Sequence, residues 1–212
     1  MLQKKQFRVY PLYNSKDWRK SMKKAMLILL VAVAAVSLFV SCKNEPEVKT
    51  YKVGETGPAG GIVFYVNPNA EKDGWTYLEA APADLAGTYL WGSDGVYGTS
   101  QEVGTGKSNT EKLLAAKDKD SSLSFPAAEA CASYSQGDKT DWFLPSLEEL
   151  KLLYKYYTEN GKGLFTADRY WSSSEESDSN GCFVNSSSGN DNSWGRNFES
   201  GKCSVRPIRS FN

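Results

Sequence analysis

The 212-residue chain contains no histidine, only four cysteines, and no excess of either charge. The lack of histidine excludes Ser-His-Asp and Cys-His catalytic sites, an imidazole general base, and zinc, haem or iron sites with histidine ligands. The length leaves room for one ordinary domain. The sequence therefore indicates a location and a fold more readily than a reaction.

The balanced charge conceals a basic start and an acidic remainder. Residues 1–41 hold eight of the 25 basic residues and one of the 25 acidic residues, which leaves 17 basic and 24 acidic residues in 42–212. This part has a formal charge of about −7 and no run of cations. Phosphate backbones attract basic surfaces, so we expect no nucleic-acid partner.

A single long hydrophobic run occupies residues 25–40 and is interrupted only by Ser37. It is shorter than the roughly 20 residues of a spanning helix, and Met22 and two lysines precede it. We therefore predict a signal peptide over residues 22–41, with a transmembrane anchor as the alternative. Residues 1–21 precede this complete signal, and we interpret them as an upstream extension from a mis-called start codon.

Residues 39–42 read Phe-Val-Ser-Cys and resemble a bacterial lipobox, in which the cysteine is diacylated and becomes the first residue. Phe39 stands where leucine is usual. We expect lipid on Cys42 to hold the protein on a membrane. The next residue, Lys43, is not the aspartate of an inner-membrane retention signal, which favours the outer membrane, at the cell surface or in the periplasmic leaflet. Residues 42–53 are then a tether, and residues 54–212 form the domain.

In the first half of the domain, the residue pattern predicts two strands and three helices. Ser146 and Glu149 form a capping box before a regular apolar stripe, and Pro126 suits a first helical turn. The predicted strands are 61–66 and 75–79, and the predicted helices are 109–117, 126–134 and 146–157. The Gly-Thr-Gly-Lys-Ser sequence at 104–108 is no Walker A loop, because Gln101 stands where that motif needs glycine.

In the second half of the domain, the residue pattern predicts an antiparallel meander of short strands joined by polar turns. The strands are 170–174, 181–186, 194–199 and 202–208, and the most polar loop is 187–193. Export permits disulfides, and three cysteines remain besides Cys42. Cys131 and Cys203 both face the core of their predicted elements and are the natural pair, while Cys182–Cys203 is the rival pairing.

Several motifs in order resemble the Lcl C-terminal domain family. They include Gly-Pro-Ala-Gly-Gly at 57–61, Asp-Trp-Phe-Leu-Pro-Ser at 141–146 and Tyr-Trp-Ser-Ser-Ser at 170–174, and the resemblance spans about residues 54–210. That family is similar in fold to C-type lectins and to the sulfatase-modifying, formylglycine-generating domain. The resemblance implies an α+β, C-type-lectin-like fold, with two to three helices packed on a small twisted antiparallel sheet and long polar loops.

The resemblance also bears on the cysteines and on function. C-type lectin folds commonly join an early helix to the last strand, which favours a Cys131–Cys203 disulfide. The chain has no collagen repeat and no Glu-Pro-Asn triplet, so neither trimerisation by that route nor a sugar-binding calcium site is supported. Nothing identifies the active site of the sulfatase-modifying relatives, so we predict no catalytic residue.

The best candidate for a ligand-binding residue is Trp194, which follows a polar loop. An aromatic face beside amides and a carboxylate suits a sugar ring. The other candidates are Glu175, Asn190, Asp191, Asn192 and Arg196. The alternative interpretation of Trp194 is a side chain folded back over the sheet.

The loop after Glu175 is rich in oxygen ligands, at Glu176, Asp178 and Asn180. Calcium is therefore the candidate cofactor, and a solvated acidic loop is the plainer interpretation. We predict no other cofactor. The leading functional hypothesis is a lipid-anchored, adhesin-like binding domain for an extracellular glycan or host protein. The alternatives are a structural envelope lipoprotein without a small ligand and an enzyme of the sulfatase-modifying type.

Overall fold

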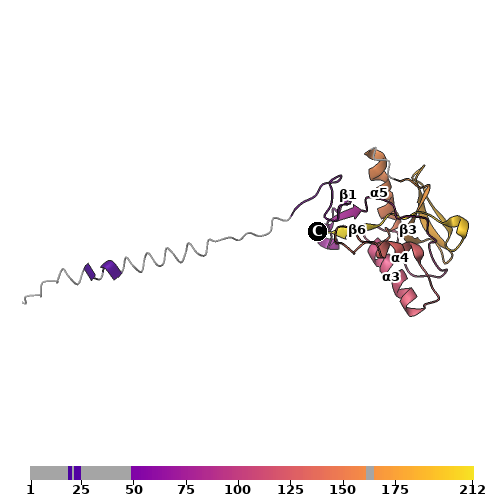
Figure 1. Ribbon diagram of the computed structural model, residues 1–212, viewed down its shortest axis with the longest axis horizontal. Coiled ribbons are helices and arrows are strands. Elements are labelled where there is room, and N and C mark those ends of the chain that lie inside the picture. The colour runs from indigo at the N-terminus through magenta and orange to yellow at the C-terminus, as the bar shows by residue number, and fades with distance from the viewer. Residues whose placement is uncertain (1–18, 21, 25–48, 161–164) are drawn as a thin grey trace, which may run out of the picture. The chain divides into compact units, whose positions relative to one another are not determined.

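The computed structural model describes residues 19–20, 22–24, 49–160 and 165–212. It divides the chain into two units, Met1–Lys49 and Thr50–Asn212 (Figure 1). Residues 19–20 and 22–24 of the first unit are helical. The hydrophobic run and Cys42 lie outside the described residues, as does most of the predicted upstream extension. None of the described helices is long and apolar enough to cross a membrane.

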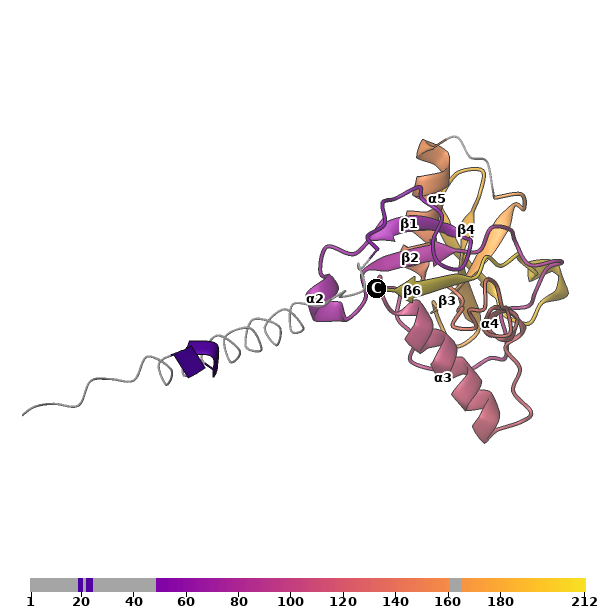
Figure 2. The ribbon, with the colours of Figure 1, turned by 60° about the vertical axis from the view of Figure 1, so that its left-hand side comes forward.

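The first sheet of the second unit joins the two ends of the domain. Strands β1 (Ile62–Val66), β2 (Tyr77–Ala80) and β6 (Ile208–Phe211) lie side by side in that order, and both pairs are antiparallel (Figure 2). The short helix α2 (Ala70–Asp73) lies between β1 and β2, and Gly74 ends it in the left-handed conformation that glycine adopts readily.

The second sheet is a meander of three antiparallel strands. Strand β3 (Arg169–Glu175) pairs with β4 (Asn180–Asn185), which pairs with the edge strand β5 (Asp191–Gly195). A single 3-10 turn, η1 (Glu199–Gly201), follows. The predicted strand at 194–199 is therefore wrong in position, because β5 begins within the predicted loop 187–193 and ends at Gly195.

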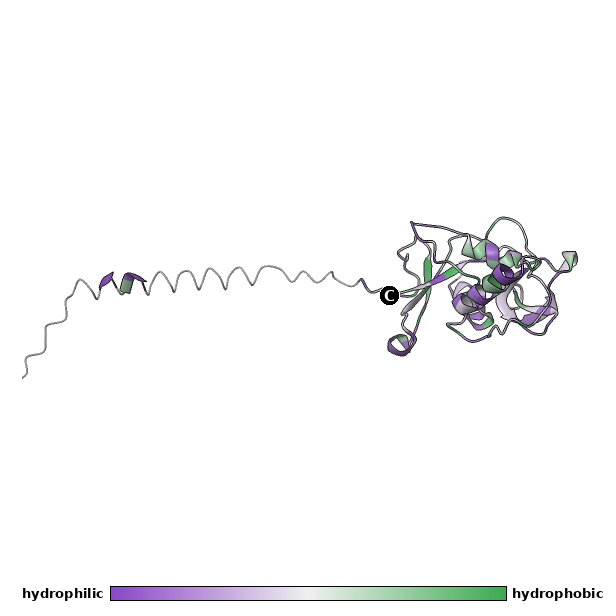
Figure 3. Cartoon of the chain, turned by 90° about the horizontal axis from the view of Figure 1, so that it is seen from below, coloured by the Kyte–Doolittle hydropathy of each residue, from purple (hydrophilic) through white to green (hydrophobic). Residues whose placement is uncertain are grey.

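Three longer helices occupy the predicted places. They are α3 (Gly106–Lys119), α4 (Pro126–Ala132) and α5 (Leu147–Glu159), and they carry both hydrophilic and hydrophobic residues (Figure 3). The capping box between Ser146 and Glu149 is present at the start of α5. Its apolar stripe is buried, with Leu150 and Leu153 fully covered. Pro126 occupies the first turn of α4, as predicted.

Strands β3 and β4 of the second sheet are buried on both faces, whereas the edge strand β5 is largely exposed. One face packs against α5, and the other packs against the loop that carries Trp91 and the segment around Cys203. The first group contains Tyr170, Cys182, Val184, Leu147 and Leu150, and the second contains Trp171, Phe183, Trp91, Cys131 and Cys203. Only the edge and the turns of this sheet remain for a ligand.

The last predicted strand, 202–208, is wrong in place and in partner. Cys203 and Ser204 form only isolated bridges with Tyr89 and Tyr170, and the strand proper starts at Ile208 and joins the first sheet. The structure is thus α+β, as predicted, with two small antiparallel sheets in place of a single meander.

The predicted burial of Cys131 and Cys203 is confirmed, but the disulfide between them is not formed. Both side chains are buried within one hydrophobic cluster. Both are free thiols in the structure, as is Cys182. The Cys203 thiol instead lies 3.4 Å from the carbonyl oxygen of Gly201.

Candidate functional site

The predicted ligand-binding residues divide into three groups. Asn192 and Trp194 alternate along β5 and share one face, while Asp191 points to the other face and lies 3.7 Å from the ammonium of Lys151 on α5. Asn190 lies exposed in the turn between β4 and β5. Glu175 and Arg196 form a separate, largely buried group. The residues predicted to form one site are therefore separated by the sheet.

Trp194 is held in place and is still open to solvent. Its side chain is 40% exposed, and the guanidinium carbon of Arg169 lies 5.1 Å from the centre of its ring. A Cβ atom on Gly201 would lie 2.3 Å from the indole, so the backbone there approaches the ring closely. Cation–π contact and close packing restrict the rotamer of the indole. Trp194 therefore presents a largely fixed aromatic surface at the edge of the sheet.

A second aromatic side chain lies four residues after Trp194, just beyond the turn that follows β5. Phe198 is 63% exposed, and its ring lies so close to Gly195 that a Cβ atom there would be 2.2 Å away. We refer to Trp194 and Phe198 together as the aromatic turn. Exposed aromatic side chains at fixed positions are more typical of binding surfaces than of the remaining surface. Sequence analysis did not single out Phe198, although its place two residues after Arg196 in a polar stretch was a usable signal.

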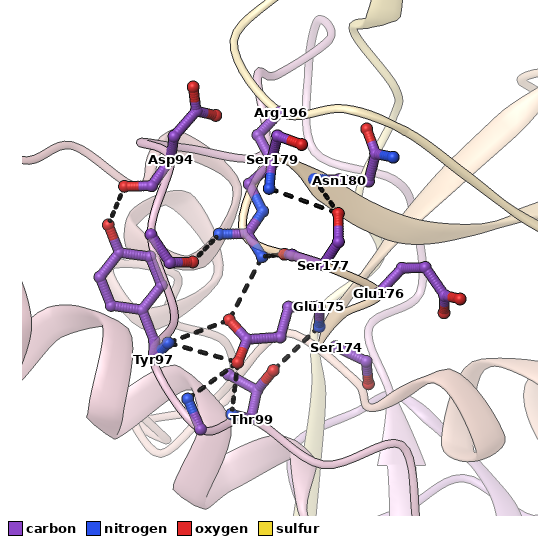
Figure 4. A network of polar contacts seen from close by, with 12 residues as sticks. Asp94, Tyr97, Thr99, Ser174, Glu175, Glu176, Ser177, Ser179, Asn180 and Arg196 are labelled. Carbon is purple, nitrogen blue, oxygen red and sulfur yellow. Dashed lines mark hydrogen bonds and ion pairs between the residues drawn. The ribbon is translucent and has the colours of Figure 1, made fainter.

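Glu175 and Arg196 are structural residues, contrary to their prediction as ligand contacts. Nη2 of Arg196 lies 3.2 Å from Oε2 of Glu175, and the side chains are 0% and 11% exposed (Figure 4). Arg196 also donates through Nη1 to the carbonyl oxygen of Gly95 at 2.6 Å, and through Nη2 to that of Ser177. The pair fastens the loop at 93–99 to the turn after β3, and Nε of Arg196, which has no partner among the described residues, is buried away from the surface.

The environment of Arg196 is aromatic as well as polar. Its guanidinium carbon lies 4.3 Å from the ring centre of Trp91 and 5.7 Å from that of Tyr97. Burial lowers the pKa of Arg196, and the carboxylate of Glu175 opposes that shift. Arginine side chains are not deprotonated in proteins, so Arg196 keeps its charge. A buried charge of this kind needs the partners described above.

The carboxylate of Glu175 also organises a glycine-containing loop. It accepts hydrogen bonds from the backbone N–H groups of Tyr97 at 3.1 Å, Gly98 at 2.8 Å and Thr99 at 3.3 Å. The Thr99 hydroxyl in turn accepts the N–H of Glu175 at 2.9 Å. Charge-assisted hydrogen bonds of this kind are among the stronger ones in proteins, and here they fix the path of an exposed loop.

Glu79 repeats this arrangement in the first sheet. It is fully buried, accepts the N–H groups of Ala59 at 3.1 Å and Gly61 at 2.8 Å, and pairs with Nη1 of Arg209 at 3.0 Å. Arg209 also pairs with Asp141. Arg206 forms a similar pair, with Asp84 at 2.6 Å.

Glu149 is a third buried carboxylate at a glycine-rich loop. It accepts the N–H of Gly104 at 2.9 Å and that of Ser146 at 2.7 Å, and a Cβ atom on Gly106 would lie 2.2 Å from it. No salt bridge to Glu149 occurs among the described residues. Burial raises the pKa of Glu149 to about 7, although the backbone hydrogen bonds act in the opposite direction. The glycines at 104–106 thus allow close approach to a carboxylate of the protein itself.

The acidic turn after β3 does not assemble a cation site. Glu175 points inward to Arg196, while Glu176 lies 3.8 Å from the sulfur of Cys182. Within the described residues, no group of three or more acidic or cysteine side chains is placed to hold a metal ion.

The comparisons with known proteins include a distant structural likeness. No family model matches the chain, and no curated protein matches it. Among solved structures, a fimbrial protein from Bacteroides ovatus is similar over 77% of this chain, with 14% sequence identity and a TM-score of 0.46. The chain spans 46% of the length of that protein. A likeness at this level carries no information on function.

Proposed function

We propose that the chain is an exported, lipid-anchored outer-membrane protein whose residues 54–212 form an adhesin-like binding domain for an extracellular glycan. The signal peptide at 22–41 and the lipobox cysteine Cys42 support export and anchoring. The order of the motifs in the sequence supports membership of the Lcl C-terminal domain family and a C-type-lectin-like arrangement. The anchor places the domain at a membrane surface, where a binding face has access to large ligands.

The observation that carries the proposal is the exposed, fixed indole of Trp194. An exposed face of a large aromatic side chain can stack on the C–H face of a sugar ring, and a ring already held by Arg169 and Gly201 loses little freedom on binding. Asn192 lies on the same face of β5 and offers its amide N–H donors to sugar hydroxyls, while its side-chain carbonyl oxygen accepts the N–H of Ser193 at 2.8 Å. Together they supply the stacking surface and the polar contacts that a glycan requires.

An extracellular protein is the second candidate ligand, and a different observation favours it. Phe198 and Val96 are 63% and 79% exposed, and apolar side chains with this exposure are typical of protein contact surfaces. The Arg196 network holds the loop that carries Val96 in place, because it binds the neighbouring Gly95. A protein ligand would use these two side chains as well as Trp194.

The buried cysteines count against a reaction that depends on a reactive thiol. Burial raises the pKa values of Cys182 and Cys203 to about 12, and it also raises that of Cys131. A reactive cysteine needs an accessible thiolate at neutral pH. A redox enzyme of the sulfatase-modifying type would need such a thiol, which is why we propose binding in its place.

The test is an array of glycans and extracellular-matrix proteins probed with soluble residues 43–212, with and without calcium and at two salt concentrations. The hydrophobic clusters described above lie within residues 59–208, so this fragment carries its own core. We expect saturable binding to glycans that Trp194→Ala abolishes. Val66→Ala is the matched control, because Val66 is also 40% exposed and lies in the other sheet.

Other outcomes separate the alternatives. Binding confined to protein spots, and reduced by Phe198→Ala, would replace the glycan with the second candidate ligand. Binding that requires calcium would revive the cation hypothesis for the acidic turn. A blank array from protein that melts cooperatively would favour a structural envelope lipoprotein.

A further inference from the structure

A pocket of about 240 Å³ lies next to the aromatic turn. It is formed between the loop at 90–94, the start of α4 and Asn197, the residue before Phe198. Leu90 and Pro126 give it apolar walls, while Ser93, Asp94 and Asn197 supply polar groups. None of the described residues that line this pocket is basic. A small cavity with apolar walls and a few polar groups is the usual form of a small-ligand site.

The walls of this pocket are joined to one another by backbone hydrogen bonds. The N–H of Gly92 donates to the carbonyl oxygen of Arg196 at 3.3 Å, and that of Ser93 donates to Ser124 at 2.8 Å. Ser124 N–H returns a bond to the Ser93 hydroxyl at 2.9 Å. A Cβ atom on Gly92 would lie 2.5 Å from the ring of Phe125, so only glycine lets these segments meet. The cavity is therefore preformed, and a ligand need not order it.

The polar groups of the pocket determine which ligand fits. Nδ2 of Asn197 donates to Oδ2 of Asp94 at 3.1 Å, which ties together the carboxylate and the amide. An ionised carboxylate has about four acceptor sites and no donor, so acceptor capacity remains for a ligand that donates. The side-chain carbonyl oxygen of Asn197 is a further acceptor. A ligand with two neighbouring hydroxyl groups can donate to both, whereas an anion would be repelled by Asp94 in a pocket without a cation.

The geometry points to a binding site for a neutral, polyhydroxylated ring, such as one monosaccharide unit at the end of a glycan. The hydroxyl groups would donate to Asp94 and Asn197, and the C–H face of the ring would lie on Leu90 and Pro126. This inference rests on the proposed function, because Asn197 connects the pocket to the aromatic turn along the chain. The aromatic turn would then bind the next units of the same glycan.

The experiment is an NMR titration of ¹⁵N-labelled residues 43–212 with methyl β-glycosides of glucose, galactose and N-acetylglucosamine, and with butylamine as the cationic comparison. We expect at least one glycoside to shift the amide signals of Ser93, Asp94 and Asn197. Asp94→Asn should weaken this binding about tenfold, because it removes a charge-assisted acceptor. Asp118→Asn, an exposed change on α3, is the matched control and should leave the affinity unchanged. Thermal melting establishes that both variants fold.

The outcomes distinguish this site from the function on which it rests. The pocket assignment is overturned if only butylamine shifts the amide signals of the pocket residues, or if no glycoside shifts them at millimolar concentration. If Trp194→Ala abolishes binding on the array while glycosides leave the pocket signals unchanged, the proposed function stands and the pocket assignment fails. If the titration succeeds while the glycan array is blank, the monosaccharide site stands and the adhesin-like function fails.

Discussion

Replacing Arg196 with methionine should destabilise the domain strongly while changing few apolar contacts. Methionine keeps an unbranched stem that can pack on Trp91, but it removes the guanidinium. Its loss leaves the carboxylate of Glu175, which is only 11% exposed, without its counter-charge. It also leaves the carbonyl oxygens of Gly95 and Ser177 without their donor.

The expected magnitude follows from these contacts. Removing one partner of a buried ion pair typically costs 3–5 kcal/mol, because the remaining charge is buried without compensation. The lost cation–π contact with Trp91 falls within the uncertainty of that range. We therefore expect the free energy of unfolding to fall by about 3–5 kcal/mol. For a domain of this size, about 2–4 °C per kcal/mol lowers the melting temperature by about 10 °C.

The assay is urea denaturation of soluble residues 43–212, followed by tryptophan fluorescence. Lys151→Met is the control, because the Lys151–Glu148 pair at 2.9 Å is solvent-exposed and should contribute under 1 kcal/mol. Adding Glu175→Gln to Arg196→Met should restore about 0.5–3 kcal/mol by removing the stranded charge. A loss no larger than that of Lys151→Met would refute the structural role of the pair.

Three further predictions concern buried groups. Burial raises the pKa of Glu149 to about 7 from an ordinary value of 4.5. The contribution of Glu149 to stability is therefore full below about pH 4.5 and is lost as the pH rises through 7. The urea concentration at the midpoint of unfolding should decrease from pH 5 to pH 8, and it should decrease less in Glu149→Gln. The thiols of Cys131, Cys182 and Cys203 should resist iodoacetamide in the native state and yield three labelled sites after unfolding without reductant, whereas a single labelled site would show a disulfide. Gly61→Ala should lower the melting temperature, because its Cβ would lie 2.1 Å from the carbonyl oxygen of Ala80; an unchanged melting curve would contradict that close approach.

Local patterns predicted the helices well because their signals lie within a few residues. The capping box at Ser146 and the apolar stripe that follows it define α5 without reference to the rest of the chain. Trp142 and Trp171 belong to the motifs at 141–146 and 170–174, and both are buried. Trp194 was singled out for its polar neighbours, and it is indeed partly exposed.

Long-range pairing was beyond the reach of the same patterns. Glu175 and Arg196 looked like exposed polar residues, but a loop some 77 positions earlier in the chain takes up the carboxylate. The last strand was assigned to the nearest meander, because no local pattern reveals that it returns to the first sheet. The role of Glu79, Glu149 and Glu175 in holding loops was not predicted for the same reason, since those loops are distant in sequence.

The position of β6 has a consequence for how the chain folds. The first sheet is complete only when the last residues of the chain lie beside β2, and its Glu79–Arg209 pair joins positions 130 residues apart. Contacts of such high sequence separation slow folding, because the long loop must close before they form. A ribosome-bound chain lacks this strand until residue 211 has been made. For the exported protein that we propose, the delay would keep the preceding polypeptide unfolded, and thus ready for translocation, until β6 has been made.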